Sequence, residues 1–302
     1  MKGYRKTIVV FGCTGTVGKV VFERLLKEDC YVRGVLRHPK RTLPVPLNAS
    51  NEHSYVSADL EHPKEVEAAC FQADTVFLLT ATHSNQIQQE INIIKAAKKM
   101  GVNKVVKLSA PSTGTIESVE VAKWHREIEA CLESSGLDFC CLSPYAFMQN
   151  WERNTFTIQR FGKIFGAMKD APRNYIDARD VAEIAVKQLL QNEGAAEKYL
   201  TLSGPEAISY PEMAKRLSKV TNHHIEYVDI PPSELRTMLQ QRAKLPKWLA
   251  NHIVELDELA VKKPEPTTDS VEKLLLKKPR VMDAYLLESK HCFQKKRLGI
   301  FN

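Results

Sequence analysis

Three glycines, each three residues from the next, lie early in the sequence, in the stretch "TIVVFGCTGTVGKVVFERLL". An apolar run precedes them and a helical pattern follows them. In such a strand–loop–helix start, the first glycine permits a tight turn, the second lets the backbone approach a pyrophosphate, and the third lets the helix pack on the strand. Free N–H groups at the helix start would then hold the phosphates. We predict a dinucleotide-binding loop of Gly12, Thr14, Gly15, Val17 and Gly18.

Basic residues follow the second apolar run, in "GVLRHPKR", with no carboxylate beside them. An acidic residue at this position binds the ribose hydroxyls of NAD, whereas an arginine accommodates the 2′-phosphate of NADP. Arg37, Lys40 and Arg41 therefore favour NADPH over NADH as the cofactor. The alternative for these residues is a solvated basic loop.

Small and polar residues stand where three other strands are expected to end. In an open parallel sheet, ligands bind outside the carboxyl ends of the strands. The residues at these ends are Asp59 with Leu60, Thr80 with Ala81, and Ser109, and we predict that they line the cofactor. Each could equally be a residue that only caps a helix or forms a turn.

Short β-branched runs alternate with longer helical patterns through the first half of the chain, which is typical of a parallel α/β sheet. Strands are expected at 7–12, 31–37, 54–60, 75–81, 104–110 and 138–144, and helices at 18–29, 62–71, 84–101 and 118–136. We predict a doubly wound parallel Rossmann sheet with a smaller, mostly helical C-terminal substrate domain. The expected domains are 1–150, which binds NAD(P), and 151–302, of which about 175–203 completes the Rossmann core.

Bulk composition narrows the class of protein. The 302 residues are 43% hydrophobic and 26% charged, as in an ordinary globular protein. The basic residues that give the net charge of +7 are mostly scattered along the sequence, so we expect no nucleic-acid partner. The seven cysteines contain no C-x-x-C pair, which argues against a metal site. No apolar run approaches the ~20 residues of a membrane span, and no signal peptide is recognised, so we expect a cytoplasmic protein without a membrane partner.

The sequence resembles the NmrA-like family of atypical short-chain dehydrogenases/reductases. The resemblance covers nearly the whole chain and rests on "VFGCTGTVG", "LRHPKR", "YIDARDVAEIAV" and "LSGPEAISYPEMAKRLSKV", in this order. It implies a Rossmann domain that binds NADPH or NADH. Members of the family include quinone and aromatic reductases and proteins that bind the cofactor to report redox state. The partner is therefore expected to be a small-molecule hydride acceptor or a regulatory protein, and a homodimer stays open.

The usual proton donor of short-chain dehydrogenases is missing, because no tyrosine in the sequence has a lysine four residues later. Epimerisation of sugar nucleotides also needs that tyrosine, so its absence argues against an epimerase. In the branches that resemble isoflavone reductase, a lysine replaces the pair, and His125 stands at the matching position here. On a helix, His125 shares a face with Val121, Ile128 and Leu132, whereas Lys123 points away. We predict that His125 donates a proton, with a structural role as the alternative.

The resemblance also implies a substrate pocket after the sixth strand, in "CLSPYAFMQN". Tyr145, Phe147, Met148 and Asn150 would line the mouth of the nicotinamide pocket, and packing between the domains is the alternative. Ser143 stands where the family usually has an arginine, so that arginine's contacts are not carried over.

Cys13 lies inside the glycine loop, where the family usually has an alanine. A thiol near a helix N-terminus tends to have a lowered pKa, which would make it redox-sensitive. The alternative is a cysteine that fills an alanine-sized space. The sequence thus supports two functions: an NADPH-dependent reductase of a quinone, an enone or a similar flat acceptor, and a non-catalytic NADPH sensor that regulates a protein partner.

Overall fold

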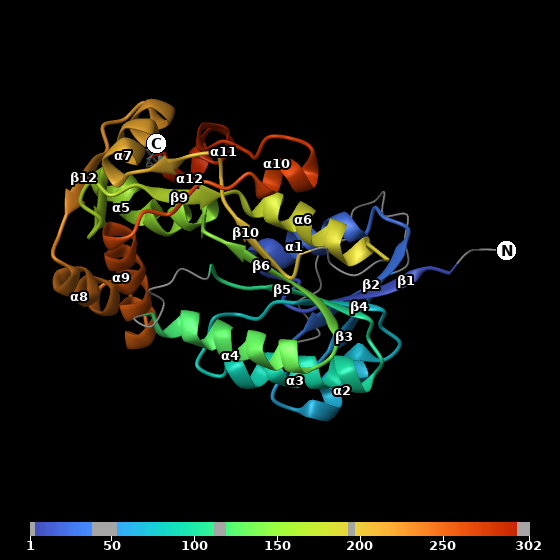
Figure 1. Ribbon diagram of the computed structural model, residues 1–302. Coiled ribbons are helices and arrows are strands. Elements are labelled where there is room, and N and C mark those ends of the chain that lie inside the picture. The colour runs from blue at the N-terminus through green and yellow to red at the C-terminus, as the bar shows by residue number, and fades with distance from the viewer. Residues whose placement is uncertain (1–3, 38–52, 112–118, 193–196, 295–302) are drawn as a thin grey trace, which may run out of the picture. The chain divides into compact units, whose positions relative to one another are not determined.

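The computed structural model describes residues 4–37, 53–111, 119–192 and 197–294 (Figure 1). Two compact units make up the chain. The first contains residues 1–144, 178–202 and 273–276, and the second contains residues 145–177, 203–272 and 277–302. Lys40 and Arg41 lie outside the described residues. Within the described ranges, no helix combines the length and apolar character that a membrane crossing requires.

The first unit is built on a seven-stranded sheet in the order β10-β6-β5-β4-β1-β2-β3. Every neighbouring pair in this sheet is parallel. The strand order reverses between β1 and β4, as in a doubly wound Rossmann fold, so the predicted fold class is confirmed. The strands are β1 (Lys6–Val10), β2 (Cys30–Leu36), β3 (His53–Ser57), β4 (Thr75–Leu78), β5 (Lys104–Leu108), β6 (Asp138–Pro144) and β10 (Tyr199–Leu202).

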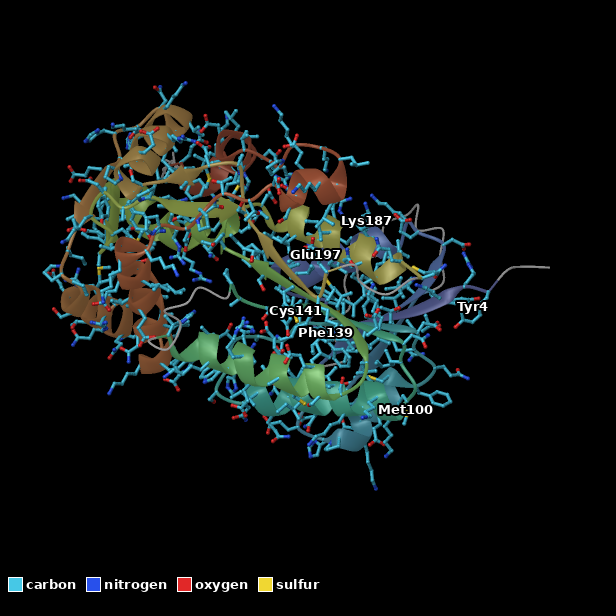
Figure 2. The ribbon with its side chains drawn as sticks, viewed as in Figure 1. Tyr4, Met100, Phe139, Cys141, Lys187 and Glu197 are labelled. Carbon is cyan, nitrogen blue, oxygen red and sulfur yellow. The ribbon has the colours of Figure 1, made fainter. Side chains whose placement is uncertain are left out.

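Helices cover both faces of this sheet. Figure 1 shows α2, α3 and α4 on one face and α1 and α6 on the other. Because both faces are covered, the central strands are buried without alternation, and every residue of β4 and of β5 is buried. Phe139 and Cys141, labelled in Figure 2, are buried on β6. The helices are α1 (Thr16–Leu25), α2 (Pro63–Cys70), α3 (Gln86–Lys99), α4 (Glu120–Ser134) and α6 (Ala178–Leu190).

The second unit contains two small sheets and most of the remaining helices. One sheet has the order β11-β9-β7, and the other pairs β12 with β8. Its strands are β7 (Ala146–Phe147), β8 (Lys163–Gly166), β9 (Arg173–Ile176), β11 (Ala207–Ile208) and β12 (Glu226–Asp229). Its helices are η2 (Met148–Asn154), α5 (Thr155–Phe161), α7 (Tyr210–Thr221), α8 (Pro232–Gln241), α9 (Lys247–Lys262), α11 (Met282–Glu288) and α12 (Lys290–Phe293), and α10 (Ser270–Leu275) is divided between the units.

The core of the second unit gathers apolar residues from segments far apart in the sequence. Met148 and Trp151 from η2 pack with Met213 and Leu217 from α7 and with Leu286 from α11. Ser209 is the N-cap of α7, because its hydroxyl accepts a hydrogen bond from the backbone N–H of Glu212. This core holds η2 and β9 in place, and both contribute to the cavity described below.

Candidate functional site

The two outer glycines of the loop, Gly12 and Gly18, are required because packing inside the first unit leaves no room for a side chain. Gly12 has a φ of +69°, and a Cβ there would lie 2.6 Å from the carbonyl oxygen of Leu79. A Cβ on Gly18 would lie 2.1 Å from the carbonyl oxygen of Gly12. Neither position can take a side chain without a backbone shift, so these two glycines are explained by the turn and by helix packing.

Gly15 differs, because no neighbouring atom among the described residues requires a glycine there. It is exposed, and an added Cβ would meet only the carbonyl oxygen of Gly12, at 3.4 Å. Gly15 is also the N-cap of α1, with extended backbone at φ −85° and ψ 174°. Its missing side chain leaves the helix N-terminus open to an anion, which the N–H groups of the first turn can bind. This arrangement fits a pyrophosphate.

The other loop residues contribute in different ways. Thr14 is exposed on the same turn, whereas the Val17 side chain is 2% exposed and packs into the core. Val17 can therefore offer a ligand only its backbone. The Cys13 thiol is fully buried, and its Sγ lies 3.4 Å from the carbonyl oxygen of Val35. Burial raises the pKa of Cys13 to about 11, which favours the alternative of a cysteine that fills an alanine-sized space over that of a redox-sensitive thiol.

Residues at the ends of β2 and β3 lie on the surface. Arg37 follows β2 and is exposed. Asp59 takes part in the turn before α2, where its carboxylate accepts from the Glu61 N–H at 3.0 Å and lies 3.2 Å from His62 Nδ1. Leu60 packs against the core of the first unit, and its carbonyl accepts from Asn92 at 2.8 Å. A direct role for Asp59 or Leu60 toward a cofactor stays a prediction.

A buried polar network lies near the ends of β4 and β5. The Glu90 carboxylate, from α3, accepts from Thr80 Oγ1 at 2.8 Å and from Gln86 Nε2 at 3.0 Å. Lys107 Nζ, from β5, lies 2.7 Å from the other Glu90 oxygen, and both side chains are fully buried. Thr80 and Ala81 were predicted to line the cofactor, which stays a prediction; Thr80 is buried in this network, and Ala81 beside it is exposed. Lys107 and Glu90 were missed, although a lysine within the apolar run "KVVKLSA" was a signal that could have revealed them.

His125 joins this network. Lys107 Nζ lies 3.2 Å from His125 Nδ1 and donates to the carbonyl oxygen of Leu108 at 3.0 Å. His125 is half-buried, whereas Ile128 and Leu132 are fully buried and Lys123 is exposed, as the helical spacing predicted. Since an ammonium group can only donate hydrogen bonds, Nδ1 of His125 is the acceptor in this contact. The imidazole proton is therefore placed on Nε2.

Ser109 connects the end of β5 to α4. Its hydroxyl donates to the Glu129 carboxylate, which also forms an ion pair with Arg126. Burial raises the pKa of Glu129, and the contacts with Ser109 and Arg126 oppose that rise. Arg126 in turn donates to the carbonyl oxygen of Ala110 at 2.7 Å. These contacts fix the segment that leaves β5 against the helix that carries His125.

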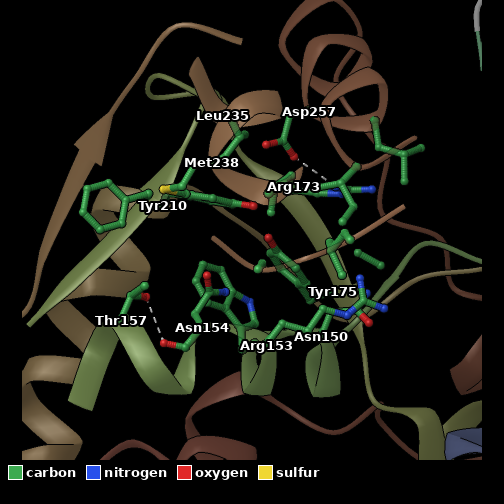
Figure 3. Close-up of a pocket in the computed structure, with 18 residues that line it drawn as sticks. Asn150, Arg153, Asn154, Thr157, Arg173, Tyr175, Tyr210, Leu235, Met238 and Asp257 are labelled. Carbon is green, nitrogen blue, oxygen red and sulfur yellow. Dashed lines mark hydrogen bonds and ion pairs between the residues drawn. The ribbon is translucent and has the colours of Figure 1, made fainter. Parts of the chain in front are cut away.

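The second unit contains a cavity of about 270 Å³ (Figure 3). Of the four predicted substrate residues, Asn150 lines this cavity. Met148 is buried in the core, Tyr145 is 7% exposed and Phe147 is half-buried. The charged and aromatic lining was not predicted from the sequence, and it consists of Trp151, Arg153, Phe165, Arg173, Tyr175, Tyr210 and Asp257.

A parallel sheet of this strand order, with a glycine loop between β1 and α1, defines a Rossmann-type nucleotide-binding fold. The model of the NmrA-like family matches residues 4–286, and the chain belongs to this family. The resemblance seen in the sequence motifs is thereby confirmed.

Comparisons with individual proteins agree with this assignment. The chain is 28% identical over 253 residues to an NAD(P)H azoreductase of Xenophilus azovorans, a match that covers 84% of this chain and 87% of the relative. An NADPH-dependent quinone oxidoreductase of Escherichia coli in complex with NADPH has a TM-score of 0.82 and 21% identity, covering 95% of this chain and 100% of that one. NmrA, a negative transcriptional regulator in complex with NAD, has a TM-score of 0.75 and 15% identity, covering 95% of each chain. The two solved structures show that the fold is shared.

Proposed function

We propose that this protein is an NAD(P)H-dependent reductase that transfers hydride to a small, flat acceptor such as a quinone or an enone. One observation carries the proposal: the open helix N-terminus at Gly15 and the Lys107–Glu90–His125 network lie at the same edge of the sheet. All strands of the first unit run parallel, so the ends of β1, β4 and β5 meet at that edge. The azoreductase relative supports the same class of reaction.

NADPH is the expected cofactor. Gly15 and the first turn of α1 would bind its pyrophosphate, and Arg37 would bind its 2′-phosphate. Arg37 is exposed at the end of β2, so its guanidinium is open to a ligand. The cofactor would supply the hydride, while residues of this chain bind it, orient it and hold the proton that accompanies the transfer.

His125 is the proposed proton donor. The contact with Lys107 places its proton on Nε2; as that proton leaves, Nδ1 would take one from the Lys107 ammonium, so that the imidazole stays neutral. Lys107 is held in turn by the buried carboxylate of Glu90. Lys107 and Glu90 are thus positioning residues for the imidazole. A quinone needs this proton least, because its reduced dianion can take protons from water. An enone needs it most, because a carbon–carbon double bond receives both hydride and proton.

The second candidate is a sensor that binds a protein partner according to NADPH occupancy. It was suggested by the missing Tyr-x-x-x-Lys pair and by Cys13. The buried thiol, with its raised pKa, removes the second of these reasons. The missing pair does not distinguish the two functions, because His125 offers another proton donor.

The experiment is to measure oxidation of NADPH and of NADH by the purified protein with a panel of quinones, enones and azo dyes. The reductase predicts acceptor-dependent oxidation above the protein-free rate, with a higher kcat/KM for NADPH than for NADH. If NADPH binds and no acceptor is reduced, the reductase is excluded. Partner binding that changes with cofactor occupancy would then support the sensor.

A further inference from the structure

The cavity of the second unit has an aromatic wall and an aliphatic wall. The aromatic wall centres on Trp151, whose ring centroid lies 5.6 Å from that of Tyr175 and 5.0 Å from that of Tyr210. The aliphatic wall includes Leu235 and Met238 of α8, both labelled in Figure 3. The volume of about 270 Å³ suits a molecule of about two fused rings. A flat apolar body in this cavity would contact both walls.

The charged groups at this cavity balance one another. The lining contains two guanidinium groups, on Arg153 and Arg173, and one carboxylate, on Asp257. Glu265 adds a second carboxylate, 3.4 Å from Nε of Arg173, and the Asp257 carboxylate lies 3.6 Å from the same guanidinium group. A charged ligand would therefore lose its hydration without finding an unpaired opposite charge, which costs free energy. The lining favours a neutral ligand.

One hydrogen-bond donor in the lining has neither an acceptor nor an opposite charge beside it. Trp151 is 2% exposed, and its indole Nε1 is buried with no hydrogen-bond partner among the residues that the structure describes. An indole N–H can only donate a hydrogen bond. Buried donors are rarely left unpaired in proteins, so this N–H indicates an acceptor atom on a ligand. A carbonyl oxygen is the acceptor that a neutral, flat molecule offers in the plane of its rings.

We propose that this cavity binds a neutral, planar, bicyclic aromatic molecule that carries a carbonyl oxygen, such as an aromatic lactone or an aryl ketone. Its rings pack against the two walls, and its carbonyl oxygen accepts a hydrogen bond from Trp151 Nε1. The site lies within the second unit, needs no cofactor and is inferred from this lining alone. It goes beyond the proposed reduction and would stand if no hydride transfer were found.

The first test is calorimetric titration of the full chain, without cofactor, with three planar bicyclic compounds. Coumarin is neutral and has a carbonyl oxygen, indole is neutral and has an N–H donor instead, and coumarin-3-carboxylate is an anion. Coumarin is expected to bind at least about tenfold more tightly than either of the others. Equal or tighter binding of indole or of the carboxylate, or no binding of coumarin, would overturn the proposal. The titration contains no NADPH, so its failure is separate from failure of the proposed reductase.

Nuclear magnetic resonance of the indole N–H groups tests the hydrogen bond itself. The sequence has three tryptophans, and the signal that disappears in Trp151→Phe is the signal of Trp151. Coumarin should move the proton resonance of this N–H downfield, because a hydrogen bond to an acceptor withdraws electron density from the proton, and indole should not. A Trp151 signal that saturating coumarin does not move downfield would contradict the proposed contact.

Variants locate the binding. Trp151→Phe removes the N–H together with part of the ring, and the lost ring contact should weaken coumarin and indole alike. The ratio of their affinities should therefore fall about tenfold, because only coumarin loses a hydrogen bond. Ala243→Phe puts a ring into the cavity from an exposed lining position and should abolish coumarin binding. Ala68→Phe, an identical change at an exposed position of α2 in the first unit, should leave it unchanged. An unchanged ratio in Trp151→Phe, or unchanged coumarin binding in Ala243→Phe, would overturn the proposal.

Discussion

Gly15 and Gly18 are expected to have different roles: Gly15 in binding the ligand and Gly18 in folding. A methyl group at Gly15 meets one atom at ordinary van der Waals distance, whereas at Gly18 it lies 2.1 Å from a carbonyl oxygen. We therefore predict that Gly15→Ala folds with only a small loss of Tm, because alanine is a poorer N-cap than glycine, and binds NADPH at least about tenfold more weakly, because the methyl group covers the helix N-terminus. Gly18→Ala should instead lose roughly 1–3 kcal/mol of unfolding free energy, as overpacked sites do.

Thermal unfolding without cofactor and calorimetric titration with NADPH measure the two effects separately. The interpretation fails if Gly15→Ala binds NADPH as the wild type does. It also fails if Gly15→Ala and Gly18→Ala lose the same stability.

Replacing His125 should lower kcat most for acceptors that need a proton from the protein. We predict that His125→Gln lowers kcat with an enone by about 100-fold, a usual contribution of a general acid, and changes kcat with a quinone much less. A purely structural histidine would affect both acceptors alike. Steady-state rates of the wild type and of His125→Gln, with NADPH saturating, distinguish the two roles.

At the scale of elements, the pair of Lys107 and Glu90 joins β5 to α3 through the interior of the first unit. Breaking a buried ion pair on one side leaves an uncompensated charge and costs about 3–5 kcal/mol. We predict a loss of this size for Lys107→Met, and a smaller loss for Lys107→Met combined with Glu90→Met, because the double variant buries no charge. Urea unfolding at neutral pH gives both values. Losses that simply add would contradict a direct pairing of the two residues.

The helix α9 carries a buried carboxyl, Asp257, and a half-buried imidazole, His252, whose titrations change the stability in opposite directions. Burial raises the pKa of Asp257 from 3.8 to about 6, so the folded state holds more protons than the unfolded state in that window, and stability falls as pH rises through it. The pKa of His252 is lowered from 6.5 to about 4, so the unfolded state holds more protons, and stability rises with pH. Each group accounts for about 3 kcal/mol between pH 4 and 6.5, with opposite sign.

Single variants of Asp257 and His252 should therefore change the pH dependence of the unfolding free energy in opposite directions. Relative to the wild type, Asp257→Asn should make the unfolding free energy rise more steeply from pH 4 to 6.5, and His252→Gln should make it fall. Glu265, whose pKa burial also raises, contributes in the same direction as Asp257 in every variant. Urea titrations at several pH values test this, and a change of the same sign in both variants would exclude the assignment.

Local patterns predicted the elements of the first unit well, since strands and helices each have their own apolar period. The ends of the elements were less accurate: the first strand was expected at 7–12, but β1 ends at Val10 because Gly12 turns the chain with a positive φ. The apolar run around Lys107 could have indicated that this lysine is buried, but its partner could not be assigned from local sequence, because Glu90 lies 17 residues away on another element. The two alternatives for Cys13 could not be separated from local sequence, because the burial of its thiol depends on Val35, which lies on another element.

At the scale of the whole molecule, the second unit was harder to predict. Its cavity combines residues from η2, β9, α7, α8 and α9, which no local spacing relates. Of that lining, the sequence analysis had named only Asn150, and it had placed Asn150 at the mouth of the nicotinamide pocket, from family resemblance. The family could be predicted from the sequence because the family's motifs occur in a fixed order along nearly the whole chain, and the family model matches residues 4–286.

The central claim is that bound NADPH gives its hydride to an acceptor on this protein. The most direct measurement is single-turnover oxidation of NADPH deuterated at one face or the other of C4, using the acceptor with the highest kcat/KM in the panel. A reductase predicts that deuterium slows oxidation when it occupies one face and not the other, because the protein holds the nicotinamide in one orientation. Equal rates for both labelled cofactors, or bound NADPH that no acceptor oxidises, would contradict the account.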